Sequence, residues 1–156
     1  MKTIGMITNT SEEIAPSVAE LDLKRITWKV SNDPYKPEMS DEEVSRAVHQ
    51  YRRFLSLKVR YPGANLVPTD DIDMIWHAHI LDTERYAYDC QRLFGSFLHH
   101  EPYFGNLGTE SQEDMGGMFE ETSRLWAEEF GEDLRTPEIF RCAGKACHSP
   151  TNCRCR

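Results

Sequence analysis

Residues 70–94 read DDIDMIWHAHILDTERYAYDCQRLF and contain the longest helical pattern of the chain. At ~100° per residue, the residues that recur at helical spacing fall within about 120° of arc. They are Ile72, Ile75, Trp76, His79, Thr83, Tyr86, Cys90, Leu93 and Phe94. Thr69 can cap such a helix at its start, and Gly95 is suited to end it. We therefore predict one helix from Asp70 to about Phe94, packed at the centre of the fold.

Three further helices are indicated, two before this segment and one after it. Ser40 and Glu43 have the spacing of a capping box, and apolar residues continue at helical spacing to about Val59. An earlier amphipathic helix is predicted over residues 21–30 and a later one over 118–130, with Gly131 as its C-cap. Residues 99–105 suggest an ordered turn, and 110–117 a polar loop. The sequence thus predicts a mainly α protein, a compact multi-helix bundle with a less ordered Cys-rich C-terminal tail.

The composition fits one ordinary domain and excludes several classes of protein. The chain has 156 residues, and no apolar run approaches the ~18 residues that a membrane span needs. The first ten residues do not form a secretory signal, so a cytoplasmic location is expected and no membrane partner. A formal charge of -8 repels phosphate backbones, so no nucleic-acid partner is expected.

The last part of the chain differs from the rest in charge and in cysteine content. Residues 135–156 hold five basic residues against one acidic residue, and four of the 5 cysteines: Cys142, Cys147, Cys153 and Cys155. We therefore divide the chain into a helical domain, residues 1–134, and a basic Cys-rich tail, residues 135–156. Four thiols beside His148 could bind a soft metal, whereas a mobile tail without a function and thiol redox reactions are the alternatives.

A candidate metal site lies on a second face of the predicted 70–94 helix. Asp73 and His77 are four residues apart and Glu84 follows seven later, so the three share a narrow face. A carboxylate and an imidazole at that spacing can share a metal ion, and His99 or His100 could fold back as a further ligand. The alternative is an ordinary helical ion pair between Asp73 and His77, worth ~0.2–0.5 kcal/mol.

His79 points away from this face, about 160° from His77 on a regular helix, so one metal ion cannot readily bind both. Its neighbours on the apolar face are Trp76 and Tyr86, which favours a core histidine with local hydrogen-bond partners. The alternative is a histidine that lines a pocket as ligand or general base, with Asp82 or a backbone carbonyl orienting the ring.

These residues resemble the glycine-rich domain-containing protein-like (GRDP-like) family. The resemblance runs from about residue 20 to 131 and includes Leu21-Asp22-Leu23, Tyr51-Arg52-Arg53-Phe54-Leu55, Val67-Pro68, residues 73–83 (DMIWHAHILDT), Tyr86, Asp89-Cys90, His99, Pro102-Tyr103-Phe104-Gly105 and Phe130-Gly131. It implies a compact helical domain and carries no assigned activity. Larger plant members have glycine-rich extensions and are linked to development and stress responses, whereas this sequence has 9 glycines, so the resemblance does not extend to those roles.

The sequence favours a small intracellular protein that binds Zn or non-haem Fe through Asp73, His77 and one of the two adjacent histidines. Such an ion could activate water or dioxygen for a small-molecule substrate, although no reaction is assigned. One alternative is a non-catalytic scaffold whose Tyr103 and Phe104 contact a protein partner. Another is a tail that handles Zn or Cu.

Overall fold

The structure is a computed structural model that describes residues 13–36, 38–101 and 112–134. Six helices make up these parts of the chain, and no strand occurs in them: α1 Pro16–Ala19, α2 Lys24–Ser31, α3 Asp41–Arg60, α4 Asp70–Leu81, α5 Thr83–Phe94 and α6 Gln112–Phe130. The predicted mainly α, multi-helix fold is therefore confirmed. Helix α1 has no counterpart among the predicted helices.

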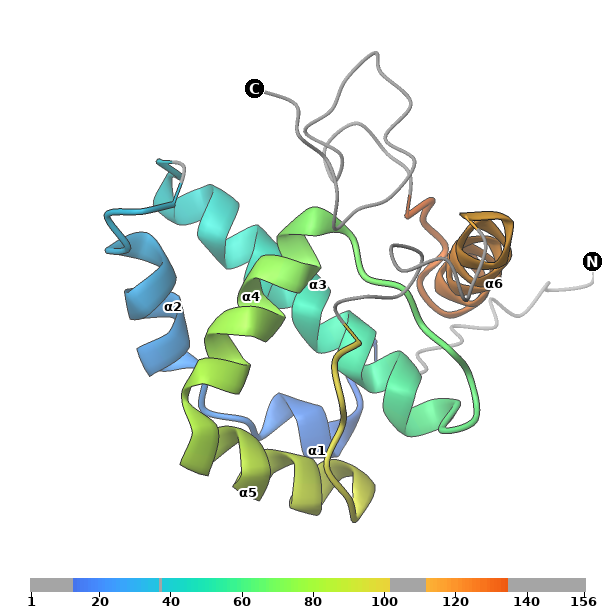
Figure 1. Cartoon of the computed structure of the whole chain (residues 1–156), viewed down its shortest axis with the longest axis horizontal. Helices are drawn as coiled ribbons and strands as arrows, with labels where there is room; N and C mark the ends of the chain where they lie inside the picture. The colour runs from blue at the N-terminus through green and yellow to red at the C-terminus, as the bar shows by residue number, and fades with distance from the viewer. Residues whose placement is uncertain (1–12, 37, 102–111, 135–156) are drawn as a thin grey trace, which may run out of the picture.

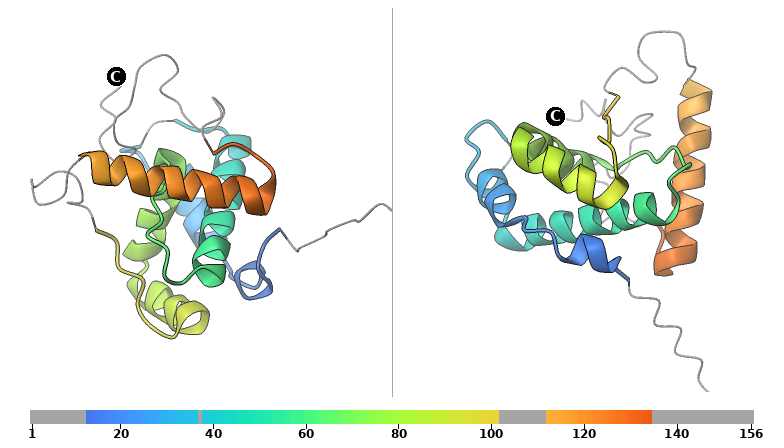
Figure 2. Two further views of the ribbon diagram at one scale, coloured as in Figure 1. Left: turned by 90° about the vertical axis from the view of Figure 1, so that its right-hand side faces the viewer. Right: turned by 90° about the horizontal axis from the view of Figure 1, so that it is seen from below.

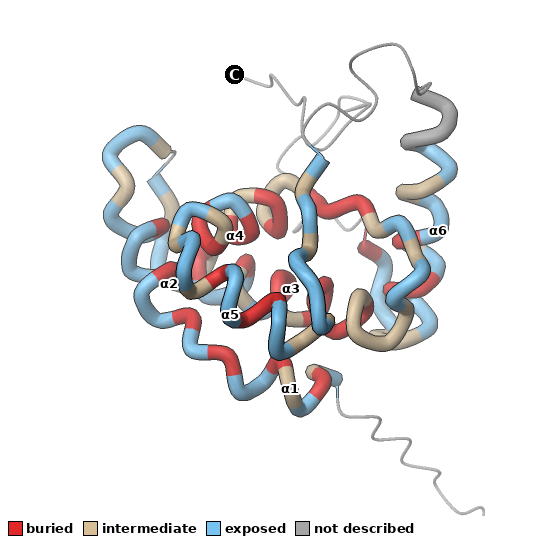
Figure 3. The backbone as a smooth tube through the Cα atoms, turned by 60° about the horizontal axis from the view of Figure 1, so that its bottom comes forward, coloured by how far each residue is buried: buried red, intermediate tan, exposed pale blue. Residues whose placement is uncertain are grey.

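Helices α3 and α4 cross at the centre, and the other helices surround them (Figure 1). Helix α3 packs against α1, α2, α4 and α6, which explains why five successive residues from Arg53 to Leu57 are buried. The predicted capping box starts this helix: the Ser40 side chain accepts from the Glu43 backbone, and Glu43 accepts from the backbone of Ser40. Figure 3 shows that the buried positions gather where α3, α4 and α5 meet.

The predicted continuous helix over 70–94 is wrong, because the chain turns at Asp82. This residue has φ -84° and ψ 70°, outside the helical region, and it ends α4 and begins α5 at the same position. Asp and the β-branched Thr83 that follows both favour helix ends over helix interiors, since Asp competes for backbone hydrogen bonds and Thr loses side-chain freedom. The turn directs α5 toward α1, so that of the two helices α4 is the one that packs most extensively against α3.

Helix α6 crosses one end of this arrangement at a steep angle (Figure 2). It begins at Gln112, six residues before the predicted start, so the part of the predicted 110–117 loop from Gln112 onward is helical despite Gly116 and Gly117. Its end is as predicted, since Gly131 takes a positive φ of 67° and its N–H bonds to the carbonyl of Ala127. Gly95 ends α5 in the same left-handed conformation, with φ 70°.

One buried arginine joins the two ends of the described chain to the centre. The guanidinium of Arg53 in α3 pairs with Glu13 and, at 2.7 Å, with Glu132. It also lies 5.0 Å from the ring centre of Phe130 at the end of α6. Leu134 is fully buried just beyond, so the core extends to the last residue that the structure describes.

Within the described residues, no helix is long and apolar enough to cross a membrane.

Candidate functional site

Three potential metal ligands converge beside the first turns of α4. Nε2 of His100 lies 2.7 Å from Oδ1 of Asp73, and Nε2 of His77 lies 3.4 Å from Oδ2 of the same carboxylate. The two Nε2 atoms lie 3.0 Å apart. Asp73 is buried, while the side chain of His77 is 50% exposed. One ligand atom from each of the three residues therefore lies within 4.8 Å of the other two, at a position that solvent can reach past His77.

The spacing of these atoms can be compared with that of a metal centre. Bonds of ~2.0–2.2 Å place neighbouring ligand atoms roughly 2.8–3.6 Å apart in octahedral or tetrahedral geometry. The two histidine Nε2 atoms lie 3.0 Å apart, and the distances from His100 to Oδ1 and from His77 to Oδ2 of Asp73 are 2.7 and 3.4 Å, close to that range. Asp73, His77 and His100 could thus hold a metal ion with small side-chain adjustments.

Loss of solvation is the main cause that lowers the pKa of His77 below its ordinary value of 6.5. The nearby charge of Asp73 opposes this shift, whereas His100 and Lys36 reinforce it. A neutral imidazole has a free lone pair, and only that form can bind a metal. Partial burial therefore favours the neutral form of His77, which is the form that a metal ion needs.

A second carboxyl group lies one turn before Asp73. Burial, followed by the charges of Asp73 and Asp71, raises the pKa of Asp70 from 3.8 to about 7. Its Oδ1 atom is buried and has no hydrogen-bond partner in the structure. The start of α4 therefore brings carboxyl groups close together, and Asp70 takes up a proton more readily than an exposed aspartate.

The structure separates the other predicted ligands from this group. Glu84 is exposed on α5, beyond the turn at Asp82, and it is not part of the three-residue group. Of the two adjacent histidines only His100 joins, whereas the ring of His99 lies 5.0 Å from that of Phe97. The four tail cysteines lie outside the described residues, as do Tyr103 and Phe104.

His79 occupies a separate, buried hydrogen-bond network. Its Nδ1 lies 2.8 Å from the hydroxyl of Tyr51 on α3, and its Nε2 lies 3.0 Å from Oδ2 of Asp89 on α5. Because a carboxylate only accepts, the ring donates from Nε2 and accepts the Tyr51 O–H at Nδ1. Arg85 donates to the same Asp89 oxygen at 3.2 Å. The residue that orients the ring is thus Asp89, and Asp82, which was considered for that role, is the residue at the helix junction instead.

Trp76 and Tyr86 form a second connection between α4 and α5, next to the one between His79 and Asp89. The indole N–H of Trp76 donates to the Tyr86 hydroxyl at 2.8 Å, and that hydroxyl donates to the carbonyl of Leu98 at 2.5 Å. The second bond fixes the segment that leads to His100. Trp76 also touches the His100 ring directly, with ring centres 4.6 Å apart.

Sequence reasoning did not assign Tyr51, Asp89 or Arg85 to this network. A signal was available for two of them, because a tyrosine within an apolar stripe needs a partner for its hydroxyl. Asp89 stands next to the predicted core residue Cys90, and a buried carboxylate needs a donor. The partner of Tyr51 depends on how α3 packs against α4, and the donor that Asp89 meets depends on the turn at Asp82, which the periodic pattern did not reveal.

Comparison with known proteins supports the predicted relationship. The profile of the UCP032817-like family matches residues 20–126. Glycine-rich domain-containing protein 1 of Arabidopsis thaliana is 35% identical over 96 residues, which is 59% of this chain and 12% of that protein. Glycine-rich domain-containing protein 2 of the same plant is 33% identical over 96 residues, with the same coverage.

The chain thus spans about an eighth of the length of these curated relatives, whose names state no reaction or ligand. No solved structure matches the chain. The matched stretch contains the whole of α2 to α5 and all three convergent ligands. The chain belongs to the UCP032817-like family, and its helical domain is similar to a part of the two glycine-rich domain-containing proteins.

Proposed function

We propose that this protein binds one divalent transition-metal ion, Zn²⁺ or non-haem Fe²⁺, through Asp73, His77 and His100. The observation that carries the proposal is the convergence of their three ligand atoms, with the two histidine Nε2 atoms 3.0 Å apart. Two neutral imidazole nitrogens facing each other need a proton or a cation between them, and a cation also neutralises Asp73.

The chemistry of the donors fits this pair of metals. Two imidazoles and one carboxylate are the ligand set of many non-haem Fe²⁺ sites and of catalytic zinc sites, which keep one or more positions open. Hard cations such as Mg²⁺ and Ca²⁺ prefer all-oxygen surroundings. Asp70 lies nearby, and its pKa of about 7 leaves it partly ionised at neutral pH, so that it adds long-range attraction for a cation.

Each of the three residues would have its own role in binding the ion. Asp73 would neutralise part of the charge of the ion, and its position on the buried side of α4 restricts it to one place. His77 would bind from the same helix one turn later. His100 would bind from the segment after α5, which the Tyr86 bond to the Leu98 carbonyl holds against Trp76. An open position would give the ion a Lewis-acid role toward water or a ligand.

The test is metal content, measured by elemental analysis of untagged protein after dialysis against Zn²⁺ and, under anaerobic conditions, against Fe²⁺. All samples carry serine in place of Cys142, Cys147, Cys153 and Cys155, so that the tail cannot contribute ligands. We expect about one ion per chain in this background and a loss of ~10–100-fold or more in affinity in His77→Asn and in His100→Asn.

His99→Asn is the matched control, because His99 is the neighbour of His100 in the sequence but not a member of the convergent group. It should bind metal as the parent protein does. Equal metal content in all four proteins would contradict the proposal, and so would the absence of metal from the parent. Metal that binds only when the four cysteines are restored would assign metal binding to the tail instead.

A further inference from the structure

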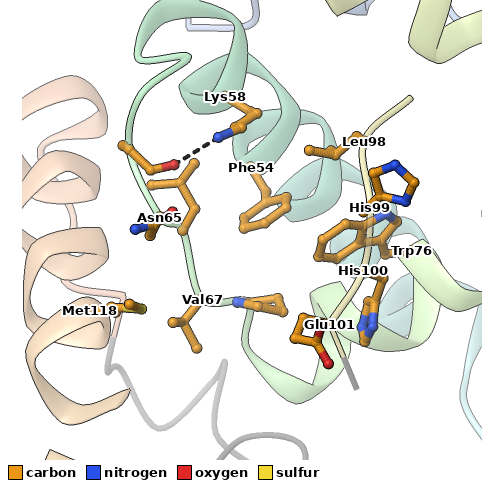
Figure 4. Close-up of a pocket in the computed structure, with 13 residues that line it drawn as sticks. Phe54, Lys58, Asn65, Val67, Trp76, Leu98, His99, His100, Glu101 and Met118 are labelled. Carbon is orange, nitrogen blue, oxygen red and sulfur yellow. Dashed lines mark hydrogen bonds between the residues drawn. The ribbon is translucent and has the colours of Figure 1, made fainter. Parts of the chain in front are cut away.

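A cavity of about 310 Å³ lies directly beside the convergent ligands, between α3, α4, the segment 64–68 and the start of α6. Figure 4 shows Trp76, Leu98, His99 and His100 along one side, with Val67 and Met118 opposite and Phe54 between them. Ligand pockets usually measure roughly 300–1,000 Å³. This cavity is at the lower limit, so it suits a molecule about the size of one substituted ring.

His100 connects the cavity with the proposed metal position. Its ring lines the cavity, while its Nε2 atom is the one that faces Asp73. The indole of Trp76 forms the adjoining wall, with its ring centre 4.6 Å from that of His100 and 5.3 Å from that of Phe54. A molecule in the cavity would therefore be separated from the ion only by the imidazole ring of His100.

The walls of the cavity are apolar and held in place. The N–H of Val67 donates to the Thr122 hydroxyl of α6 at 3.0 Å, which fixes the segment opposite Trp76. The ammonium group of Lys58 donates to the carbonyls of Pro62 and Ala64, at 3.0 and 2.7 Å. The one cation of the lining thus serves to hold the same loop, and it is not positioned as a dedicated anion site.

On the side of the cavity away from the metal position, Asn65 is the one polar side chain besides Lys58, so most polar recognition would come from the metal side. Phe54, Trp76 and the His99 ring offer aromatic faces, which favour flat apolar groups. Glu101 lines the cavity next to His100, and its carboxylate disfavours a negative charge on the part of the bound molecule that lies inside the cavity. These features together describe an apolar ring with one oxygen-containing head.

We propose that this cavity binds a small aromatic molecule whose oxygen-containing head group completes the coordination of the ion at Asp73, His77 and His100. The inference rests on the metal-binding function proposed above and adds the class of ligand. The ring would lie against Trp76 and Phe54, and the head would point past His100.

The test compares two probes that share a metal-binding head, benzohydroxamic acid with a phenyl ring and acetohydroxamic acid with a methyl group. Both are titrated into the protein that carries serine in place of the four tail cysteines and is loaded with Co²⁺, whose visible absorption reports changes in its ligands. Burial of the ring in the cavity should make benzohydroxamic acid bind at least about ten-fold more tightly. Leu98→Ala should reduce that preference by roughly three- to ten-fold and leave acetohydroxamic acid nearly unchanged.

Leu93→Ala is the matched control, because Leu93 is also partly buried against the core but does not line the cavity. It should keep the full preference. The comparison of the two probes on the unsubstituted protein decides the question even if Leu98→Ala does not fold. Equal affinities for the two probes on cobalt-loaded protein would overturn the cavity inference alone, whereas absence of bound cobalt on the same samples would overturn the metal site on which it rests. A preference retained in Leu98→Ala would also overturn the assignment to this cavity.

Discussion

Nε2 of His79 lies 3.0 Å from Oδ2 of Asp89, although ten positions separate the two residues. In a straight α-helix the same separation would be ~15 Å along the axis, since each residue rises ~1.5 Å. The turn at Asp82 folds α5 back toward α4 and makes the contact. Both side chains are almost fully buried, at 2% and 1% exposure.

His79→Asn should destabilise the protein by ~1–3 kcal/mol, because it leaves the buried Tyr51 hydroxyl without its acceptor and removes one of the two donors of Asp89, which keeps Arg85. Urea unfolding followed by circular dichroism measures the change. His99→Asn, an exposed substitution of the same kind, should stay within about 0.5 kcal/mol of the parent. A small effect of His79→Asn would mean that the network does not hold α5 in place.

The same histidine should make the fold sensitive to acid. Burial is the first cause that lowers the pKa of His79 below its ordinary value of 6.5, although Asp89 opposes the shift. The unfolded chain therefore takes up this proton more readily than the folded chain, and stability falls as the pH drops below 6.5. The parent should lose more stability than His79→Asn between about pH 7 and about pH 5. Parallel losses in the two proteins would contradict this role.

Asp70→Asn should stabilise the metal-free protein at neutral and alkaline pH. The folded protein holds the Asp70 proton up to a pKa of about 7, whereas the unfolded chain releases it near 3.8. Ionisation therefore opposes folding increasingly as the pH rises through this interval, and fully above it. After allowance for solvent screening and for the lost helix-dipole interaction, we expect a gain of ~1–2 kcal/mol above about pH 8 and little change near about pH 4.

The measurement is urea unfolding of both proteins across this pH range in the presence of a chelator. A pH-independent difference would show that another property of the substitution is responsible. Zn²⁺ bound at Asp73 should favour ionised Asp70 and so reduce the difference.

Trp76→Ala should cost ~3–5 kcal/mol, since it removes a side chain that is 5% exposed and packs against Phe54 and His100. It also leaves the Tyr86 hydroxyl without the indole donor. Trp28→Ala deletes the same side chain at a position that is 69% exposed, and it should change stability by about 0.5 kcal/mol or less. Similar costs for the two substitutions in thermal or urea unfolding would contradict the assigned burial.

A chain that ends at Thr136 should fold and unfold cooperatively, because Leu134, the last described residue, is already buried and Arg53 already has Glu132 as partner. This tests the proposed division into a domain, 1–134, and a tail, 135–156. Calorimetry gives the cooperativity, and the full chain is the control. Loss of the cooperative transition would show that the tail is integral to the domain, and recovery of the full chain by Zn²⁺ would then assign it a structural metal.

The sequence by itself determined the features that depend on neighbours three or four residues apart. It identified the Ser40 capping box, the glycine ends at Gly95 and Gly131, and the opposite directions of His77 and His79 on one helix. Helical periodicity and capping are local properties, and four residues suffice to place Asp73 beside His77. For the same reason the mainly helical fold could be predicted from spacing alone.

Only the tertiary structure decided which distant groups meet. It placed His100 rather than His99 beside Asp73, separated Glu84 from both, and joined His79 to Tyr51 and Asp89. The contact with Tyr51 depends on the packing of α4 against α3, whereas the other outcomes depend on the turn at Asp82, which interrupts the helix once and allows Tyr86, Asp89 and Cys90 to be buried. Helical periodicity cannot reveal this turn, because the free energy that favours it comes from packing between segments far apart in the chain.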